Sequence, residues 1–216
     1  MSFDQIVIFY NEDIENLLME NASPTSKYNS IFSIPKENAK QAIEMSQIFV
    51  DCFDSAGENK LKFNLEKAKV AIQKRKSMTL THYMDKSVVN QHGKISVAVD
   101  QVIGLVKDAL KIALTPGDQL YQTFAKTITD GFTNVKKLAD DNYIVWEHSS
   151  EHKTTYEYHA LFSIANKTTG AFMCVIPMAL TITVDISKSK LFFITVQDVH
   201  NYSLEVKALE VVEALQ

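Results

Sequence analysis

The chain has 216 residues, of which 46% are hydrophobic and 22% charged, and its formal net charge is −4. These values are ordinary for a globular protein with a substantial core, and we expect residues 1–216 to form a single domain. The negative charge argues against a general nucleic-acid-binding protein, because phosphate binding needs clustered Lys and Arg. With 6 glycines and none of the HExxH, GxSxG or phosphate-loop motifs, the sequence gives no support for an enzyme, and no cofactor is expected.

Signals for membrane targeting are weak. The N-terminal residues Met-Ser-Phe-Asp-Gln lack the basic and apolar regions of a secretory signal. No stretch has the ~20 apolar residues of a membrane-spanning helix, but the uncharged run at residues 171–184 exceeds the about 9–11 residues of a spanning strand. A central strand of a soluble sheet has the same composition, so composition alone favours the soluble sheet.

The first third of the chain predicts short strands and a helical hairpin. A helix starts at Pro35, a favourable first-turn residue, carries an amphipathic stripe as far as Phe53 and ends at residues 55–57. Asn64 caps the next helix, which runs to Arg75. Before this hairpin we expect a strand at residues 6–10, a short helix at 11–19, a linker at 21–27 and an extended segment at 28–34.

The middle of the chain predicts a strand followed by a second helical hairpin. Alternating residues at 77–91 favour a strand, and from Ile95 the apolar period changes to three or four residues. This period predicts a helix that ends at residues 115–117. Asp118 can cap the following helix, whose apolar residues at 120, 124, 128 and 132 share one face.

The last third, residues 143–209, predicts sequential antiparallel strands. Residues 156–165 alternate, and side chains of a strand point alternately to opposite faces. Further strands are expected at residues 171–184, 191–196 and 202–209, joined by polar turns. Because these strands are apolar on both faces and each hairpin has one apolar face, the expected fold class is α/β. It is a three-layer α/β/α sandwich with a mainly antiparallel sheet flanked by two helical hairpins.

Cysteine and histidine residues suggest no catalytic or metal site. Cys52 and Cys174 could form a disulfide, but both lie in apolar stretches, so we expect buried free thiols. His148 and His152, with acidic neighbours, could indicate a metal site or an acid/base pair. We expect them in a solvated loop instead, and no Cys/His cluster has the spacing of a zinc site.

Several motifs recur in one order along nearly the whole chain. Phe132-Thr133-Asn134 followed by YIVW at 143–146 is similar to an FTNL…AWIFW signature. The other matching segments are KISVAV at 94–99, YEYHALFSI at 156–164, TGAFMCVIP at 169–177, LFFITVQD at 191–198 and the strand at 202–209. Together these motifs resemble the Cyt family of cytolytic δ-endotoxins, which are insecticidal pore-forming cytolysins.

The resemblance implies the cytolysin fold in a protein that binds membrane phospholipid directly and permeabilises the bilayer. The family is described as acting by an oligomeric pore or in a detergent-like manner. The implied partners are membrane phospholipids and further copies of the chain, as a protoxin dimer and as a membrane oligomer, and no nucleic acid. The protein would be soluble when produced, released or secreted, and active at the membrane of a target cell.

The resemblance also implies proteolytic activation. Family protoxins carry terminal extensions, and the strand at residues 6–10 resembles their N-terminal strand. Residues 1–27 would then form a pro-strand and linker, with cleavage within residues 21–27 and Lys27 as the candidate position. The chain stops at Gln216, soon after the last strand, so we expect the C-terminal extension to be missing.

We expect the membrane-active part to be the strands, which form the sheet core until the covering helices move. Helices can swing away at a bilayer, because their apolar faces can lie in the lipid interface. Strands can insert only when copies pair their edges, since each open backbone group in hydrocarbon costs several kcal/mol. The membrane-embedded candidates are Phe162, Ile164, Val175, Ile182, Phe193 and Ile194, and the helix layer on the sheet is represented by Val102, Val106 and Leu110.

Two other functions fit the same residues. One is a non-lytic membrane-associated virulence factor on the same fold, anchored through an acylated Cys52 or Cys174. The other is a lipid-binding module that holds an apolar ligand between sheet and helices and causes no leakage. The resemblance ranks the cytolysin first.

Overall fold

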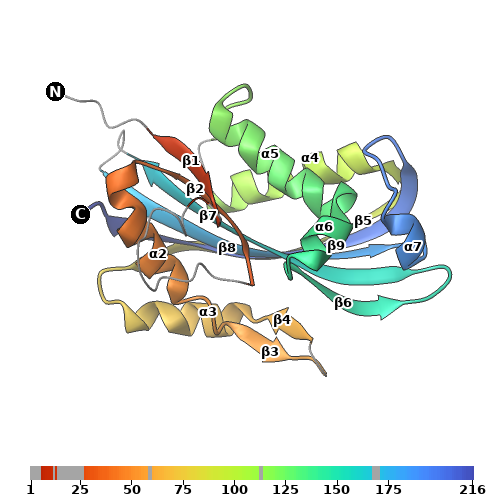
Figure 1. Ribbon diagram of the computed structural model, residues 1–216, viewed down its shortest axis with the longest axis horizontal. Helices are drawn as coiled ribbons and strands as arrows, with labels where there is room; N and C mark the ends of the chain where they lie inside the picture. Colours follow the sequence, from red (N-terminus) through yellow and green to blue (C-terminus); the bar gives the residue numbers. More distant parts are fainter. Residues whose placement is uncertain (1–5, 12, 14–26, 58–59, 112–113, 167–170) are drawn as a thin grey trace.

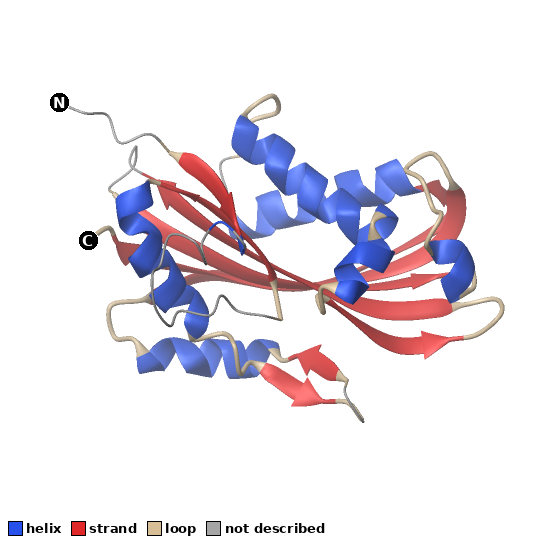
Figure 2. Cartoon of the chain, in the orientation of Figure 1, coloured by secondary structure: helices blue, strands red, loops and turns tan. Residues whose placement is uncertain are grey.

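The computed structural model has three layers, with a sheet between two groups of helices (Figure 1). It describes residues 6–11, 13, 27–57, 60–111, 114–166 and 171–216. The helices of one outer layer are α2 (Ala39–Gln47) and α3 (Leu65–Ala71), and those of the other are α4 (Ile95–Leu110), α5 (Gln119–Thr133) and α6 (Val135–Asp140). Figure 2 shows the two groups on opposite faces of the strands.

The sheet of seven strands is mainly antiparallel. Its strands are β1 (Val7–Tyr10), β2 (Asn29–Ile34), β5 (Thr79–Lys94), β6 (Ile144–Ser149), β7 (Thr154–Asn166), β8 (Phe172–Val184) and β9 (Val199–Ala214). Their order is β1-β2-β7-β8-β9-β5, and β6 also pairs with β7. The β2–β7 pair is parallel, and the other described pairs of the sheet are antiparallel. The shorter elements are η1 (Lys36–Asn38), η2 (Ile72–Lys74), α7 (Lys188–Leu191) and a hairpin of β3 (Phe53–Ser55) and β4 (Leu61–Phe63).

Two hydrophobic clusters lie on the two faces of the sheet. Successive residues of a strand point to opposite faces, so Tyr158 and Phe162 pack under α4 and α5, whereas Leu161 and Val175 pack over α2 and α3. A sheet that is apolar on both faces needs a helix layer on each. The expected three-layer α/β/α sandwich with a mainly antiparallel sheet is confirmed.

The first helical hairpin is shorter than expected. The helix from Pro35 was expected to reach residue 55, but α2 ends at Gln47 and Phe53 already begins β3. Phe53 pairs with Phe63 of β4, and their ring centroids lie 6.0 Å apart. Helical spacing in this stretch therefore reflected burial of the apolar residues and not a continuous helix. The cap at Asn64 is confirmed, since its side chain accepts a hydrogen bond from the Lys67 amide.

The helix from Ile95 also ends earlier than expected. Lys111 adopts a left-handed conformation with φ of 56°, which ends α4 at Leu110. Leu114 is nevertheless buried at 2% exposure. Its helical spacing from Leu110 arises because the chain returns to the core after the turn.

The strand expected at residues 191–196 is wrong. The segment is a series of turns after α7, in which the Phe193 amide donates to Lys190 O and the Ile194 amide to Leu191 O. Leu191 and Ile194, three positions apart, both point into the core, while Phe193 is 83% exposed. Phe193 and Ile194 are therefore not strand residues, because the apolar run follows a helical turn and not the alternation of a strand.

Only some of the elements expected at the N-terminus fall within the described residues. Strand β1 lies within the strand expected at residues 6–10 and pairs with β2 along the sheet edge. Most of the helix expected at 11–19, and residues 21–26 of the linker, lie outside the described residues. The extended segment at 28–34 corresponds to β2.

Helix α5 approaches the sheet so closely that it depends on a glycine. A Cβ added at Gly131 would lie 2.6 Å from the Tyr158 ring. We expect Gly131→Ala to lower the free energy of unfolding by about 1–3 kcal/mol, because α5 or the ring must shift. Urea unfolding of the purified protein measures this change.

The matched control is Gly104→Ala in α4, where an added Cβ meets no atom within 4 Å. There the substitution should raise stability by about 0.5–1 kcal/mol through helix propensity. Equal effects at the two positions would contradict the close approach of α5 to Tyr158.

Candidate functional site

The candidate site is the apolar face of β7 and β8 beneath α4 and α5. On this face the Phe162 ring centroid lies 4.4 Å from that of Phe124 on α5. The Tyr156 hydroxyl donates to Gly131 O at 2.8 Å, and the Tyr158 hydroxyl donates to Thr127 O at 3.3 Å. Burial raises the pKa of both tyrosines well above the usual value, so both hydroxyls stay neutral. The α5 helix is thus held by apolar packing and by neutral hydrogen bonds.

Helix α4 covers the same face. Val102, Val106 and Leu110 are 0%, 0% and 1% exposed and belong to the cluster between sheet and helices. Their spacing of four residues places them on one side of the helix. The Asn90 amide of β5 also donates to the Gln101 side chain of α4 at 2.6 Å.

The strand positions expected to enter a membrane are divided between the two faces. Phe162 and Ile182 are buried beneath α4 and α5, and the half-buried Ile164 packs against the same cluster. Val175 faces α2 and α3 instead. Ile194 joins the first cluster from the turn after α7, and Phe193 lies in solvent. The structure therefore brings together four of the six positions, of which Ile194 comes from a turn.

The opposite face of β7 carries a buried pair of titratable side chains that sequence reasoning missed. Glu157 and His159 are each 1% exposed, and His159 Nε2 lies 2.7 Å from Glu157 Oε1. The Phe63 amide of β4 donates to Glu157 Oε1 at 2.6 Å, and the Thr181 hydroxyl donates to Oε2 at 3.1 Å. The available signal was two titratable residues, two positions apart, inside an apolar strand, since such residues share a face.

These partners decide the protonation of Glu157. Burial by itself raises the pKa of Glu157, but the hydrogen bond and charge of His159, with the bonds from Phe63 and Thr181, lower it below the usual 4.5. A buried carboxylate with such partners stays ionised at neutral pH. The pair therefore fastens the β3–β4 hairpin to the sheet.

A second polar tie joins α2, η2 and β9. The Arg75 guanidinium binds both oxygens of Glu213 at 2.6 and 2.8 Å and Glu44 at 3.1 Å. Its pKa is raised by the Glu213 hydrogen bond above all, so the cation persists at any physiological pH. The α2–α3 layer is thus fixed to the sheet by ionic contacts in addition to apolar packing.

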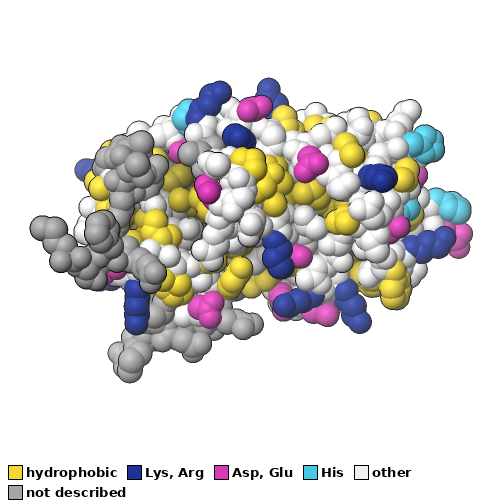
Figure 3. All heavy atoms as spheres, turned by 90° about the horizontal axis from the view of Figure 1, so that it is seen from above, with side chains coloured by type: hydrophobic (Ala, Val, Ile, Leu, Met, Phe, Trp, Pro, Cys, Tyr) yellow, Lys and Arg dark blue, Asp and Glu magenta, His cyan; other side chains and the backbone are white. Residues whose placement is uncertain are grey.

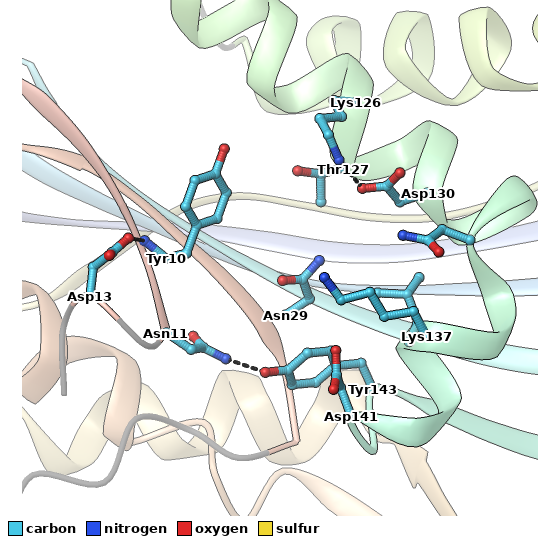
Figure 4. A pocket seen from close by; sticks show the side chains of 12 residues that line it. Tyr10, Asn11, Asp13, Asn29, Lys126, Thr127, Asp130, Lys137, Asp141 and Tyr143 are labelled. Atoms are coloured by element: carbon cyan, nitrogen blue, oxygen red, sulfur yellow. Dashed lines mark hydrogen bonds and ion pairs between the residues drawn. The ribbon is translucent and has the colours of Figure 1, made fainter.

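A polar cavity of about 540 Å³ lies between the N-terminal segment and helices α5 and α6 (Figure 4). The Asn11 amide donates to the Tyr143 hydroxyl at 2.7 Å and to Tyr28 O at 3.0 Å, which anchors the residue after β1. Lys126 and Asp130 form an ion pair at its rim. The Asn11 contacts join the end of β1 to β2 and to the start of β6.

Lys27 and Cys52 lie under the α2–α3 layer, whereas Cys174 packs against the cluster on the opposite face of the sheet. Lys27 Nζ donates to Val50 O at 3.2 Å and lies 5.4 Å from the Phe53 ring centroid, so this side chain is engaged. Both cysteines are free thiols, Cys52 buried and Cys174 half-buried. Burial raises the pKa of Cys52 to about 11 and that of Cys174 well above its usual value, which makes both poor nucleophiles.

The remaining candidate features are two histidines, potential metal ligands, potential membrane-spanning helices and a small gap in the core. His148 and His152 are exposed around the β6–β7 turn, as expected for a solvated loop. No group of three or more potential metal ligands occurs among the described residues. In the same part of the chain, no helix is long and apolar enough to cross a membrane. A gap between sheet and helices near Phe132 and Tyr156 has no room for a water molecule.

Known proteins share this sequence and arrangement. The family model described as Bacillus thuringiensis toxin matches residues 12–216. The type-2Ba cytolytic delta-endotoxin of Bacillus thuringiensis subsp. israelensis is 34% identical over 194 residues, which cover 90% of this chain and 72% of the relative. The chain belongs to the Cyt family of cytolytic delta-endotoxins. The type-1Ba toxin of subsp. neoleoensis is also similar, with 30% identity over 81% of this chain and 67% of its own length.

Solved structures agree with the family assignment. The activated Cyt2Ba monomer of subsp. israelensis superposes on this toxin with a TM-score of 0.80 at 34% identity, covering 88% of this chain and 99% of that one. A delta-endotoxin structure gives a TM-score of 0.82 at 32% identity, covering 92% and 86% of the two chains. The toxin therefore has the fold that its sequence motifs indicated.

The buried pair makes stability depend on pH. The pKa of Glu157 is lower in the folded state, so its contribution is present above pH 4.5 and is lost as pH falls through the lowered folded-state value. We expect Glu157→Gln to lower the free energy of unfolding at neutral pH by about 1–3 kcal/mol, since a neutral amide accepts weaker hydrogen bonds from Phe63 and Thr181 than the ionised carboxylate does. The difference from the unsubstituted toxin should shrink in acid, as measured by urea unfolding at several pH values.

Asp54→Asn is the matched control. Asp54 pairs with Lys67 at 2.6 Å, but both side chains are about half exposed, so solvent screens the pair and the change in stability should be small. A difference for Glu157→Gln that stays constant from neutral to acid pH would contradict the assignment.

Proposed function

We propose that the toxin binds phospholipid directly and permeabilises the bilayer through strands that insert as an oligomer. The observation that carries the proposal is the apolar face of β7, β8 and β9 that α4, α5 and α6 cover. Its residues include Tyr158, Phe162, Leu180, Ile182 and Val206, each at most 1% exposed. Relatives named cytolytic delta-endotoxins support a lytic activity.

The α4–α6 layer is the one that we expect to leave the sheet. Apolar packing favours contact in water, but lipid tails are as apolar as the core, so this preference disappears in the bilayer. Ionic ties such as Arg75 with Glu213 become more costly to break in a low dielectric. The described contacts of α4 and α5 with the sheet are apolar packing and neutral hydrogen bonds, and the α2–α3 layer has the ionic ties.

Strands β7 and β8 have the length of membrane-spanning strands, and the sheet has one apolar and one partly polar face. β7 and β8 have 13 residues each, and at roughly 3.3 Å per residue they are long enough to span the ~30 Å hydrocarbon core at a tilt. The opposite face of the sheet is partly polar. It carries Glu157 and His159 of β7, Thr181 of β8 and the Glu205–Lys207 ion pair of β9. We propose that the first face meets lipid and that the polar part of the second faces water. Open edges in hydrocarbon are costly, so neighbouring copies must pair.

Proteolytic activation fits the proposed pairing of strand edges between copies. β1 occupies the outer edge of β2, where another copy would otherwise pair. The similar Cyt2Ba structure is that of an activated monomer, which supports an activation step for this toxin. We propose cleavage within residues 21–27 in a toxin that is released by its producer and acts at a target membrane.

Dye release from phosphatidylcholine vesicles without receptor protein tests the function. We expect release of small dyes with a sharp size cutoff, increased by limited trypsin treatment, because an oligomer of strands has a fixed bore. Release without a cutoff would indicate detergent-like lysis and reject insertion of paired strands. Vesicle binding with no release under either condition would reject the lytic function in favour of a lipid-binding module.

A reversible tether tests the departure of the helix layer. Cysteines replacing Asn90 and Gln101, whose side chains meet at 2.6 Å, can be joined by a short reducible thiol cross-linker. The cross-linked Asn90→Cys/Gln101→Cys toxin should bind vesicles normally and lose at least about nine-tenths of its leakage activity, since α4 cannot leave β5. Reduction should restore leakage. The native thiols, with their raised pKa, react slowly.

The control cross-link joins two strands that move together. His82 of β5 and Glu210 of β9 lie 3.1 Å apart, so His82→Cys/Glu210→Cys links neighbours within the sheet. This cross-link should leave leakage unchanged. Full leakage from the tethered α4–β5 variant would contradict the opening of this layer.

A further inference from the structure

One end of the molecule carries an exposed phenylalanine in an aromatic and basic setting. We define the aromatic tip as Trp146, Phe192 and Phe193 with Lys188 and Lys190. It lies around α7, at the end of the molecule opposite β1 and the C-terminus (Figure 1). Phe193 is 83% exposed, more than any other exposed large hydrophobic residue described. A single exposed apolar side chain is common, whereas apolar side chains gathered at a surface mark an interaction or membrane site.

The turn that presents Phe193 is held from within. Leu191 and Ile194 on either side are buried at 1% and 7% exposure. The Phe193 amide donates to Lys190 O at 3.0 Å, so the backbone conformation is fixed. Because Leu191 and Ile194 both point inward, Phe193 between them must point outward. Its exposure is therefore a consequence of the local fold.

The neighbours of Phe193 are aromatic and cationic. The Phe192 ring centroid lies 6.1 Å from that of Trp146, and Lys188 Nζ lies 3.9 Å from the Trp146 ring centroid. Lys190 is exposed beside them. Aromatic rings with lysines are the side chains that settle at the boundary between headgroups and acyl chains.

Two acidic groups at this end, Asp185 and Asp198, are engaged by neighbouring groups. Asp185 accepts a hydrogen bond from Asn201 at 2.7 Å and lies 3.3 Å from His200, and Asp198 accepts one from the Thr195 amide at 2.6 Å. They therefore oppose an anionic surface less than free carboxylates would. The same end carries basic, acidic, His and hydrophobic side chains close together in the space-filling view (Figure 3, right). Mixed charges of this kind suit a zwitterionic surface better than a strongly anionic one.

We propose that the aromatic tip is the surface by which the toxin first docks on a zwitterionic phospholipid bilayer, with Phe193 entering between the headgroups. The inference deepens the proposed lytic function and rests on it. A bilayer fits better than a protein partner, because the tip projects outward and a specific protein interface needs a broad complementary patch of roughly 800 Å² per partner. Docking at this end leaves the edge strand β1, at the other end, free of the membrane.

Vesicle sedimentation with phosphatidylcholine tests the tip. Phe193→Ser should weaken partitioning about tenfold, and Phe193→Leu, which keeps an apolar side chain, should retain at least about half of the affinity. Val70→Ser is the matched control, because Val70 is 60% exposed on α3, away from the tip. Val70→Ser should partition as the unsubstituted toxin does. All three substitutions are at exposed positions, and unchanged thermal unfolding would show that the fold is intact.

A fluorescence measurement locates the contact. The chain has a single tryptophan, Trp146 within the tip, so Trp146→Phe/Phe193→Trp moves the only indole to position 193. Its emission should shift to the blue on vesicles and be quenched by lipids brominated near the headgroup. Trp146→Phe/Val70→Trp, the control in the same background, should show neither change. A shift at position 70 and none at position 193 would overturn the proposal.

The outcomes separate this inference from the proposed function. If the unsubstituted toxin neither sediments with vesicles nor releases dye, the proposed function fails. If it does both and Phe193→Ser partitions equally well, the lytic function stands and docking through the aromatic tip is rejected. Weaker partitioning of Phe193→Ser with leakage recovered at a higher toxin concentration would support a role in docking alone.

Discussion

The structure depends on burial of one apolar sheet face beneath α4, α5 and α6. Tyr156, Tyr158 and Phe162 of β7 meet Phe124, Thr127 and Gly131 of α5 so closely that a single methyl group at Gly131 has no room. The hydrophobic effect stabilises this contact only while water is the alternative environment. A hydrocarbon interior removes that alternative, so the interaction that maintains the fold in solution gives it little advantage in a bilayer.

The two helix layers differ in the physics of their attachment. The α2–α3 layer is tied to the sheet by Arg75 with Glu213 and by Glu157, which holds the β4 backbone at Phe63. Buried ions are tolerated only with complete sets of partners, and separating them leaves charges without solvent. The α4–α6 layer has no such penalty in its described contacts. In the mechanism that we propose, this difference gives the conformational change its direction and selects the sheet face that meets lipid.

The two ends of the molecule present different surfaces. At one end β1 covers the β2 edge, and Asn11 fastens the following residue to Tyr143 and to the Tyr28 backbone. At the other end, the turn after α7 presents Phe193 beside Lys188 and Trp146. Docking and edge pairing are thus assigned to separate surfaces. A toxin held by its tip can still offer a sheet edge to a second copy.

Local sequence determined most strands of the large sheet, the layers and the family. Alternation at residues 156–165 places Tyr158 and Leu161 on opposite faces in the structure, because side-chain direction in a strand depends only on position parity. Where the spacing of apolar residues fits more than one conformation, only the tertiary structure decided between them. Phe53 pairs in β3, and Phe193 leaves the core, because partners distant in the chain select among conformations that local spacing permits equally. The same reason explains the Glu157 cluster, whose partners Phe63, His159 and Thr181 come from three strands. A pattern along one segment specifies a face, but only packing specifies what lies against it.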